Sequence, residues 1–128
     1  QERGLRQITR TRQLVLIIER AVQKRLRGRI HAATRTFQAL RIATNSELEN
    51  LEQGLAAALS LVAEGGKIAV ISFHSLEDRI VKRFFNNTLS LKPITKKPTI
   101  ASLREVRINP KARSAKLRVA VKQQPLPS

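Results

Sequence analysis

Hydrophobic residues recur at helical spacing in three stretches of the first half of the chain. The first predicts a helix over residues 11–26, because its apolar positions repeat every three or four residues. The second predicts a helix that begins at residue 34 or 36 and runs through residue 43. The third predicts a helix over residues 46–63, where Ser46 and Glu49 have the spacing of a capping box.

The pattern changes after the glycine pair Gly65-Gly66, which suits a helix exit because glycine accepts left-handed backbone. Lys67–Phe73 is apolar on both faces, which predicts a buried strand of the parallel type. Ser75 is the predicted cap of the next helix, with Asp78 three positions on and an apolar face that reaches Phe85. Helix, glycine turn, apolar strand and helix in this order are typical of a doubly wound α/β fold.

The C-terminal third predicts shorter elements. Residues 91–95 favour a short strand that Pro93 interrupts, and Ser102 with Glu105 forms a second capping box for a short helix. The last element alternates, which predicts an antiparallel or edge strand. Its apolar face holds Leu117, Val119 and Val121, and its polar face holds Lys116, Arg118 and Lys122.

Positive charge is concentrated at both ends of the chain. The 128 residues carry 25 Lys+Arg and 9 Asp+Glu, a formal net charge of +16. Residues 1–42 hold 11 basic and 2 acidic residues, residues 43–91 hold 4 and 6, and residues 92–128 hold 10 and 1. Two basic arms around a nearly neutral centre favour a polyanionic partner, and nucleic acid above all. The plainer alternative is that these basic residues form a solvated surface. A membrane partner is disfavoured because no long predicted helix is basic on one face and aromatic on the other.

Composition narrows the chemistry further. The chain has no Cys and two His, which argues against disulfides, cysteine nucleophiles and a dedicated zinc site, so we expect no metal. No apolar run approaches the ~20 residues that cross a bilayer, and no secretory leader precedes the first helix, so we expect a cytoplasmic protein. The chain opens without Met, and we expect it to be a fragment.

Polar side chains are densest directly after the predicted strand, in Ser72–Arg79. In open α/β sheets ligands bind at the carboxyl ends of strands, so this cluster is in the right place for a site. Capping and surface charge explain its other polar residues, which leaves Ser72 and His74 as the candidates for a direct role. A serine hydrolase is disfavoured because no nucleophile elbow is present. No glycine-rich loop follows a strand, so no cofactor pocket is visible.

Three long blocks of the sequence form a recognisable set: His31–Ile42, Ile71–Lys82 after Gly65-Gly66, and Asn109–Arg118. Together they resemble the RsmH (MraW) family of small-subunit ribosomal RNA methyltransferases. The resemblance implies transfer of a methyl group from S-adenosylmethionine to the exocyclic N4 of a cytidine in the decoding centre. It covers only the C-terminal part of the family, so the glycine-rich cofactor loop and the acidic ribose ligand are expected upstream. No cofactor-binding residue is therefore assigned, and we expect the isolated 128-residue chain to be inactive.

The family's fold is a Rossmann-like methyltransferase sheet with a helical insertion. The resemblance implies that residues 1–34 belong to the insertion, residues 35–122 complete the methyltransferase domain, and residues 123–128 form a tail. Ser72 and His74 are then expected near the target base. The expected partners are the small-subunit ribosomal RNA or the 30S particle, and the N-terminal half of the same enzyme. The residues expected to contact RNA are Arg29, Arg35, Arg41, Arg113, Lys116 and Arg118.

Size and charge alone leave a second interpretation open, a non-catalytic RNA-binding protein of the ribosomal-protein type. The apolar strand argues against it. So does the absence of Tyr and Trp, which removes most platforms on which bases stack. For the helix arginines Arg35 and Arg41, and for the strand cations Lys116 and Arg118, the alternative is a solvated surface position.

Overall fold

The computed structural model describes residues 7–22 and 32–124. The chain divides into two compact units, residues 1–47 and residues 48–128. No helix in the described part of the chain is long and apolar enough to cross a membrane.

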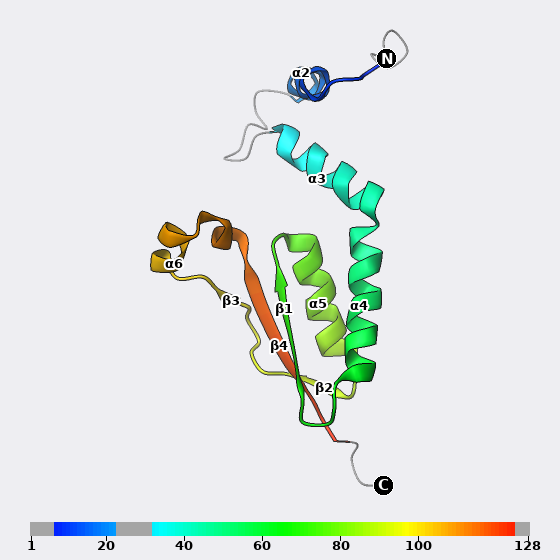
Figure 1. Ribbon diagram of the computed structural model, residues 1–128, viewed down its shortest axis with the longest axis vertical. Coiled ribbons are helices and arrows are strands. Elements are labelled where there is room, and N and C mark those ends of the chain that lie inside the picture. The colour runs from blue at the N-terminus through cyan, green and yellow to red at the C-terminus, as the bar shows by residue number, and fades with distance from the viewer. Residues whose placement is uncertain (1–6, 23–31, 125–128) are drawn as a thin grey trace. The chain divides into compact units, whose positions relative to one another are not determined.

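The first unit contains helices α2 (Thr11–Ala21) and α3 (Ala32–Asn45), which contact each other (Figure 1). The N-cap of α2 is Arg10, one residue before Thr11, whose side chain is of the type that favours N-caps. Gln13 caps this end, because its Oε1 accepts hydrogen bonds from the backbone N–H groups of Thr9 (3.0 Å) and Arg10 (3.1 Å). Ile18 is the buried residue of the apolar stripe that predicted this helix.

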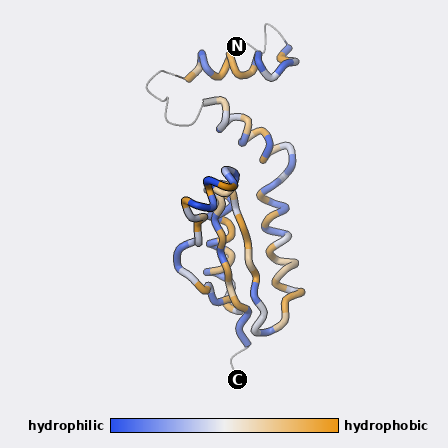
Figure 2. The backbone as a smooth tube through the Cα atoms, turned by 60° about the vertical axis from the view of Figure 1, so that its left-hand side comes forward, coloured by the Kyte–Doolittle hydropathy of each residue, from blue (hydrophilic) through white to orange (hydrophobic). Residues whose placement is uncertain are grey.

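Ser46 separates α3 from α4 (Glu47–Leu61). Its φ of 49° lies in the left-handed region, whereas an N-cap residue takes extended backbone. The predicted capping box of Ser46 and Glu49 is therefore wrong, although the helix that it predicted is present. Hydrophilic and hydrophobic positions alternate along the helical backbone of α4 (Figure 2), as expected of a helix with one buried stripe.

The exit from α4 has two separate supports. Gly65 has a φ of 75°, the left-handed backbone that the glycine pair predicted. The Lys122 ammonium donates to the carbonyl oxygens of Leu59 (3.0 Å) and Val62 (2.9 Å). A cation at a helix C-terminus satisfies carbonyls that lack intrahelical partners and compensates the helix dipole. This lysine therefore ties the end of α4 to the last strand.

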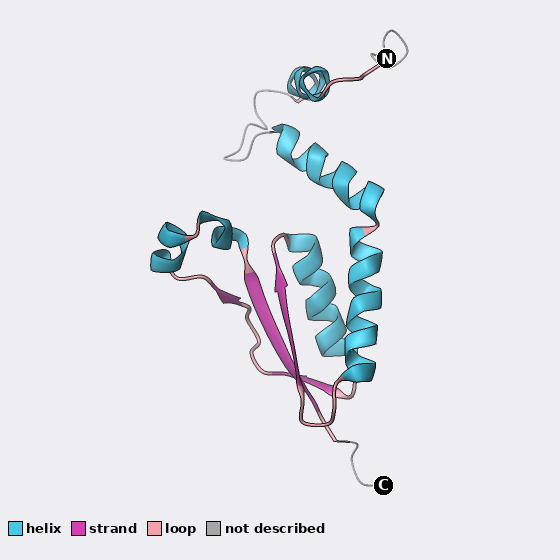
Figure 3. Cartoon of the chain, in the orientation of Figure 1, coloured by secondary structure: helices cyan, strands magenta, loops and turns pink. Residues whose placement is uncertain are grey.

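The sheet of the second unit has four strands: β1 (Lys67–Ser72), β2 (Leu91–Pro93), β3 (Thr99–Ile100) and β4 (Lys116–Lys122). Their order is β1-β4-β2, β3 also pairs with β4, and every pairing is antiparallel. The last strand therefore lies inside the described sheet and β1 lies at its edge (Figure 3).

The prediction for β1 was wrong in two respects within the described residues. Its described neighbour is the antiparallel β4 rather than a parallel strand. Burial follows one face, because Ile68 is 7% exposed whereas Ile71 is 58% exposed. An apolar run has high strand propensity in either direction, so composition does not decide which neighbour the strand takes.

Helices α4 and α5 (Ser75–Asn87) lie on one side of the sheet (Figure 1) and enclose the core with it. Val81 and Phe85 on α5 are almost fully buried, and each contributes about 1.5–3 kcal/mol of transfer free energy. The core therefore holds α5 firmly against the strands. Its buried members are Leu55, Ile68, Val81, Phe85, Leu91 and Ala120.

The faces of β4 are reversed from the prediction. Arg118 (8% exposed) and Ala120 (0%) lie on the helix side, opposite Val70 and Ile68 of β1. The predicted apolar face, with Val119, is only half-buried. Register with β1 decides this, because antiparallel partners share a face of the sheet. Arg118, which the alternating pattern places in solvent, is thus a buried cation on the helix side of the sheet.

Two short elements precede β4. Helix α6 (Leu103–Ile108) is capped by Ser102, whose Oγ accepts from the backbone N–H of Glu105 at 3.1 Å, which confirms the Ser102 half of the predicted capping box. The 3-10 helix η2 (Pro110–Ser114) follows Asn109. Its buried residue, Ala112, anchors the turn that leads into β4.

Candidate functional site

Ser72 is the last residue of β1, and His74 lies in the turn between β1 and α5. The two candidates from the sequence therefore lie where β1 ends and α5 begins, as predicted. His74 is the N-cap of α5, so the predicted cap at Ser75 is wrong. The correction has a chemical reason, because an imidazole nitrogen accepts a hydrogen bond as a serine hydroxyl does.

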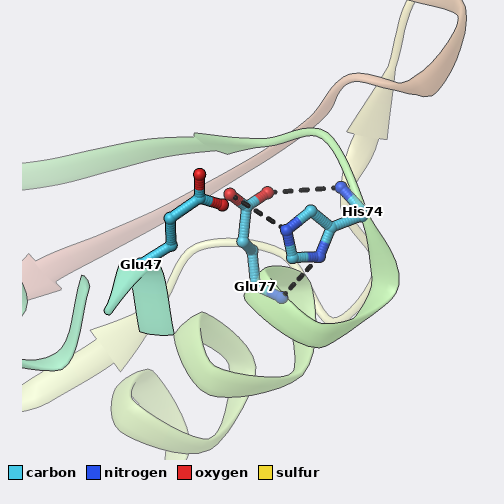
Figure 4. A group of neighbouring side chains, drawn as sticks. All are labelled: Glu47, His74 and Glu77. Carbon is cyan, nitrogen blue, oxygen red and sulfur yellow. Dashed lines mark hydrogen bonds and ion pairs between the residues drawn. The ribbon is translucent and has the colours of Figure 1, made fainter. Parts of the chain in front are cut away.

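His74 and Glu77 form a reciprocal capping box (Figure 4). His74 Nδ1 accepts from the backbone N–H of Glu77 at 3.3 Å. Glu77 Oε2 accepts from the backbone N–H groups of Phe73 (2.8 Å) and His74 (3.2 Å). Glu77 is therefore part of the turn and not a surface charge. The signal for it was the three-residue spacing between His74 and Glu77, which is that of a capping box.

The cap determines where the proton of a neutral His74 lies. Because Nδ1 accepts a hydrogen bond, the neutral ring carries its proton on Nε2. Nε2 is buried and lies 3.3 Å from Glu77 Oε1, outside hydrogen-bond geometry, and has no hydrogen-bond partner among the described residues. Nδ1 of the imidazole thus caps α5, whereas Nε2 of the neutral ring remains available as a hydrogen-bond donor.

Ser72 is turned into the protein. It is 3% exposed, and its hydroxyl donates a long hydrogen bond of 3.5 Å to the carbonyl oxygen of Lys116. This bond follows from the register, in which Ser72 lies opposite Lys116. The proximity of Ser72 and His74 to a target base stays a prediction.

Asp78, one residue after Glu77, joins α5 to β4. Its Oδ1 accepts from Arg118 Nε at 2.7 Å and its Oδ2 from Arg118 Nη2 at 3.2 Å, while Lys116 Nζ lies 3.5 Å from Oδ2. The hydrogen bond from Arg118, with the positive charges of Arg118 and Lys116, holds the pKa of Asp78 below its usual value of 3.8 despite desolvation. Asp78 therefore does more than compensate the dipole of α5, because its carboxylate also binds two cations of β4.

The structure brings three of the sequence candidates together. Register places Ser72 opposite Lys116, and Lys116 shares Asp78 with Arg118. Arg113 is exposed on η2. Arg29 lies outside the described residues.

Two further candidates, Arg35 and Arg41, lie on α3 in the first unit. Both are exposed, and Arg41 Nε pairs with Glu47 Oε1 at 2.8 Å while its side chain stays 57% exposed. Their contact with RNA stays a prediction, as it does for the other basic candidates.

Comparison with known proteins identifies the family. Residues 1–123 match the MraW methylase family. The chain belongs to the MraW methylase family. The resemblance inferred from the three sequence blocks is thereby confirmed.

Curated relatives of this MraW chain carry the name ribosomal RNA small subunit methyltransferase H. The protein from Deinococcus deserti is 57% identical over 113 residues, which cover 88% of this chain and 37% of that protein. The protein from Synechocystis is 61% identical over 95 residues, 74% of this chain and 31% of that protein. The protein from Pseudothermotoga lettingae is 52% identical over 118 residues, which cover 90% of this chain and 40% of that protein. The chain thus spans between 31% and 40% of the length of these three curated relatives.

Sequence reasoning missed two lysines of the MraW chain that the structure brings beside Arg118. Lys82 on α5 and Lys96 after β2 line one hollow with Arg118 of β4. These residues come from three segments that are distant along the chain. No local spacing signals such a convergence, so only the sheet pairing reveals it.

Proposed function

We propose that the protein containing this chain transfers a methyl group from S-adenosylmethionine to the N4 amine of a cytidine in small-subunit ribosomal RNA. The observation that carries the proposal is the match of residues 1–123 to the MraW methylase family. The name of the curated relatives, ribosomal RNA small subunit methyltransferase H, supports the RNA substrate. The small-subunit RNA or the 30S particle is then the partner, and the site of action is cytoplasmic.

The described hollow does not fit S-adenosylmethionine. Lys82, Lys96 and Arg118 line it, and these cations would repel the positive sulfonium. No carboxylate among its lining residues is available for ribose hydroxyls. We assign the cofactor mainly to the part of the enzyme outside this chain, where the family resemblance implies the glycine-rich loop.

The role that we assign to the chain itself is to complete the sheet and to bind RNA. We propose that β1 lies within a Rossmann-like methyltransferase sheet, with further strands along its free edge. Residues 1–34 then belong to the helical insertion and residues 35–122 to the methyltransferase domain. The exposed apolar side chains Ile71 (58% exposed) and Phe73 (56%) support this assignment, since such surface is usually covered.

Binding of RNA is supported by charge and position. The segment from residue 92 onwards carries ten basic residues and one acidic residue. Arg113 is exposed on η2, and Lys116 lies at the start of β4 with its side chain 36% exposed. We assign these two residues to phosphate contacts. Arg118 is held by Asp78 and reaches RNA only through the surface that it lines.

The decisive experiment uses the full-length protein, methyl-labelled S-adenosylmethionine and 30S particles that lack the modification. Label is expected on a cytidine, and nucleoside mass spectrometry should place the methyl group on N4. A methyl group found on a ring carbon, or on a base other than cytosine, would overturn the assignment of N4 as the methyl acceptor. RNA binding without any methyl transfer would favour the non-catalytic interpretation instead.

A second measurement tests the RNA surface. Arg113→Gln with Lys116→Gln should lower the slope of log affinity against log salt, by up to about 0.9 for each lost duplex phosphate contact. The matched control is Arg79→Gln with Lys67→Gln, which removes two exposed charges from the nearly neutral centre of the chain. Equal slopes for both double variants would show that the Arg113 surface is only solvated.

A further inference from the structure

A small hollow opens between the C-terminal half of α5, the loop after β2 and the middle of β4. It is partly open to solvent. Phe85, Pro93 and Val119 supply apolar walls, and Lys82, Lys96 and Arg118 supply three cations. Each of these cations comes from a different segment, so the fold and not the local sequence assembles the group.

The positive charge of this group is only partly balanced. Arg118 is bound to Asp78 through Nε and Nη2, which leaves Nη1 without a hydrogen-bond partner among the described residues. Lys82 and Lys96 are exposed, and neither pairs with a carboxylate in the described part of the chain. The group therefore keeps an excess of positive charge.

Gathering cations in this way is unfavourable unless an anion joins them. Like charges that line one hollow repel one another, and the mostly buried guanidinium of Arg118 is screened by water less than an exposed charge is. The same field attracts an oxyanion, and the guanidinium of Arg118 is already oriented by Asp78. Fixing a cation before binding reduces the ordering that the ligand must induce.

We propose that this hollow holds a backbone phosphate of the RNA substrate, between Lys82 and Lys96 and over the guanidinium of Arg118. The inference rests on the proposed function and adds a contact site to it. Lys82 and Lys96 act as mobile point charges, whereas Arg118 is the oriented donor. Phosphate contacts position a nucleic acid and carry no sequence information, so the site sets the register of the RNA on the protein.

The lining of the hollow favours a phosphate over a nucleobase. No aromatic face apart from Phe85 lines it, which offers little for stacking a base. A phosphodiester needs only the charge and the donors that are present.

The test compares two double variants of the full-length protein. Lys82→Gln with Lys96→Gln removes the mobile charges of the hollow and leaves Arg118 and its partner intact. Arg83→Gln with Lys67→Gln is the matched control, because it removes one exposed charge from α5 and one from β1 outside the hollow. All four lysines and arginines are exposed, so equal melting temperatures are expected.

The measurement is the affinity for a fluorescently labelled RNA hairpin between about 50 and 200 mM KCl. The hollow variant should lose about one unit of salt slope, the amount for one phosphate contact, and the control should keep the wild-type slope. Lys82→Arg with Lys96→Arg should restore the slope, because it returns the charge. In the methylation assay the KM for RNA should rise and kcat should stay unchanged.

The outcomes separate the two proposals. If the wild-type protein and the hollow variant bind RNA with the same salt slope, the assignment of the hollow to a phosphate is overturned and the proposed function stands. If no form of the protein binds RNA, both are overturned. Inorganic phosphate that shifts the NMR signals of Lys82 and Lys96, with an unchanged RNA slope, would place a free anion there and also overturn the RNA assignment.

Discussion

Arg118 on β4 donates two hydrogen bonds to the carboxylate of Asp78 on α5, at 2.7 Å from Nε and 3.2 Å from Nη2. The arginine and aspartate side chains are only 10% and 14% exposed. The pair joins the first turn of α5 to the middle strand of the sheet, across 40 residues of chain. It therefore sets both the position of the turn after β1 and the orientation of one cation of the hollow.

Removing the charge of Asp78 should destabilise the protein. Asp78→Asn leaves the Arg118 guanidinium mostly buried without its counter-ion, which should cost roughly 2–4 kcal/mol of unfolding free energy. Urea denaturation measures the change. The control Glu52→Gln removes one negative charge from an exposed position on α4 and should change stability by less than about 0.5 kcal/mol. Equal losses in both variants would contradict a specific role for the pair.

The Asp78 pair should also make stability depend on pH. Folding lowers the pKa of Asp78 from 3.8, so its contribution is full above that value and is lost as the pH falls through the folded-state pKa. The wild-type protein should therefore lose stability relative to Asp78→Asn only below about pH 4. Thermal melts of both proteins over this range give the comparison. Parallel curves would show that Asp78 is not stabilised by its neighbours.

The N-cap of α5 can be tested with two adjacent residues. His74→Ala removes the acceptor for the Glu77 N–H and should cost about 1 kcal/mol. His74→Asn should recover most of the loss, because its side-chain oxygen is a good cap. Ser75→Ala should have little effect, since Ser75 is already the first helical residue. A larger effect at Ser75 than at His74 would return the cap to the serine that the sequence suggested.

Gly66 should resist any larger residue. A Cβ there would lie 2.6 Å from Val62 Cγ2 and 2.8 Å from the carbonyl oxygen of Ala63, so Gly66→Ala should cost about 1–3 kcal/mol. Gly54→Ala is the matched control, because a Cβ on this α4 residue meets nothing within 4 Å. It should stabilise the helix by about 0.5–1 kcal/mol. Relative to the wild-type protein, the denaturation midpoint should fall for Gly66→Ala and rise for Gly54→Ala.

The free edge of β1 should make the 128-residue chain associate with itself. Ile71 and Phe73 are more than half exposed, and β1 pairs only with β4 in the described part of the chain. An open apolar edge is a template for another strand. Light scattering should show oligomers, and Ile71→Lys should reduce them. A monodisperse monomer with slowly exchanging amides from Ile68 to Ser72 would contradict this expectation.

Local sequence determined most of the elements of this protein. The helix that became α4, the strand Lys67–Ser72 and the cap at Ser102 were all predicted, because each depends on residues within a few positions of one another. The family was also readable from three blocks of sequence, and the match over residues 1–123 confirmed it. Neither inference needed a long-range contact.

Tertiary structure decided how those elements are used. The direction of the neighbour of β1 and the buried face of β4 depend on pairing across the sheet, and a one-residue shift in register would turn Arg118 outward. The same pairing brings Arg118 to Asp78 and, with the loop after β2, to Lys82 and Lys96. Local patterns record only near neighbours along the chain, whereas register and charge convergence arise from segments that meet when the chain folds.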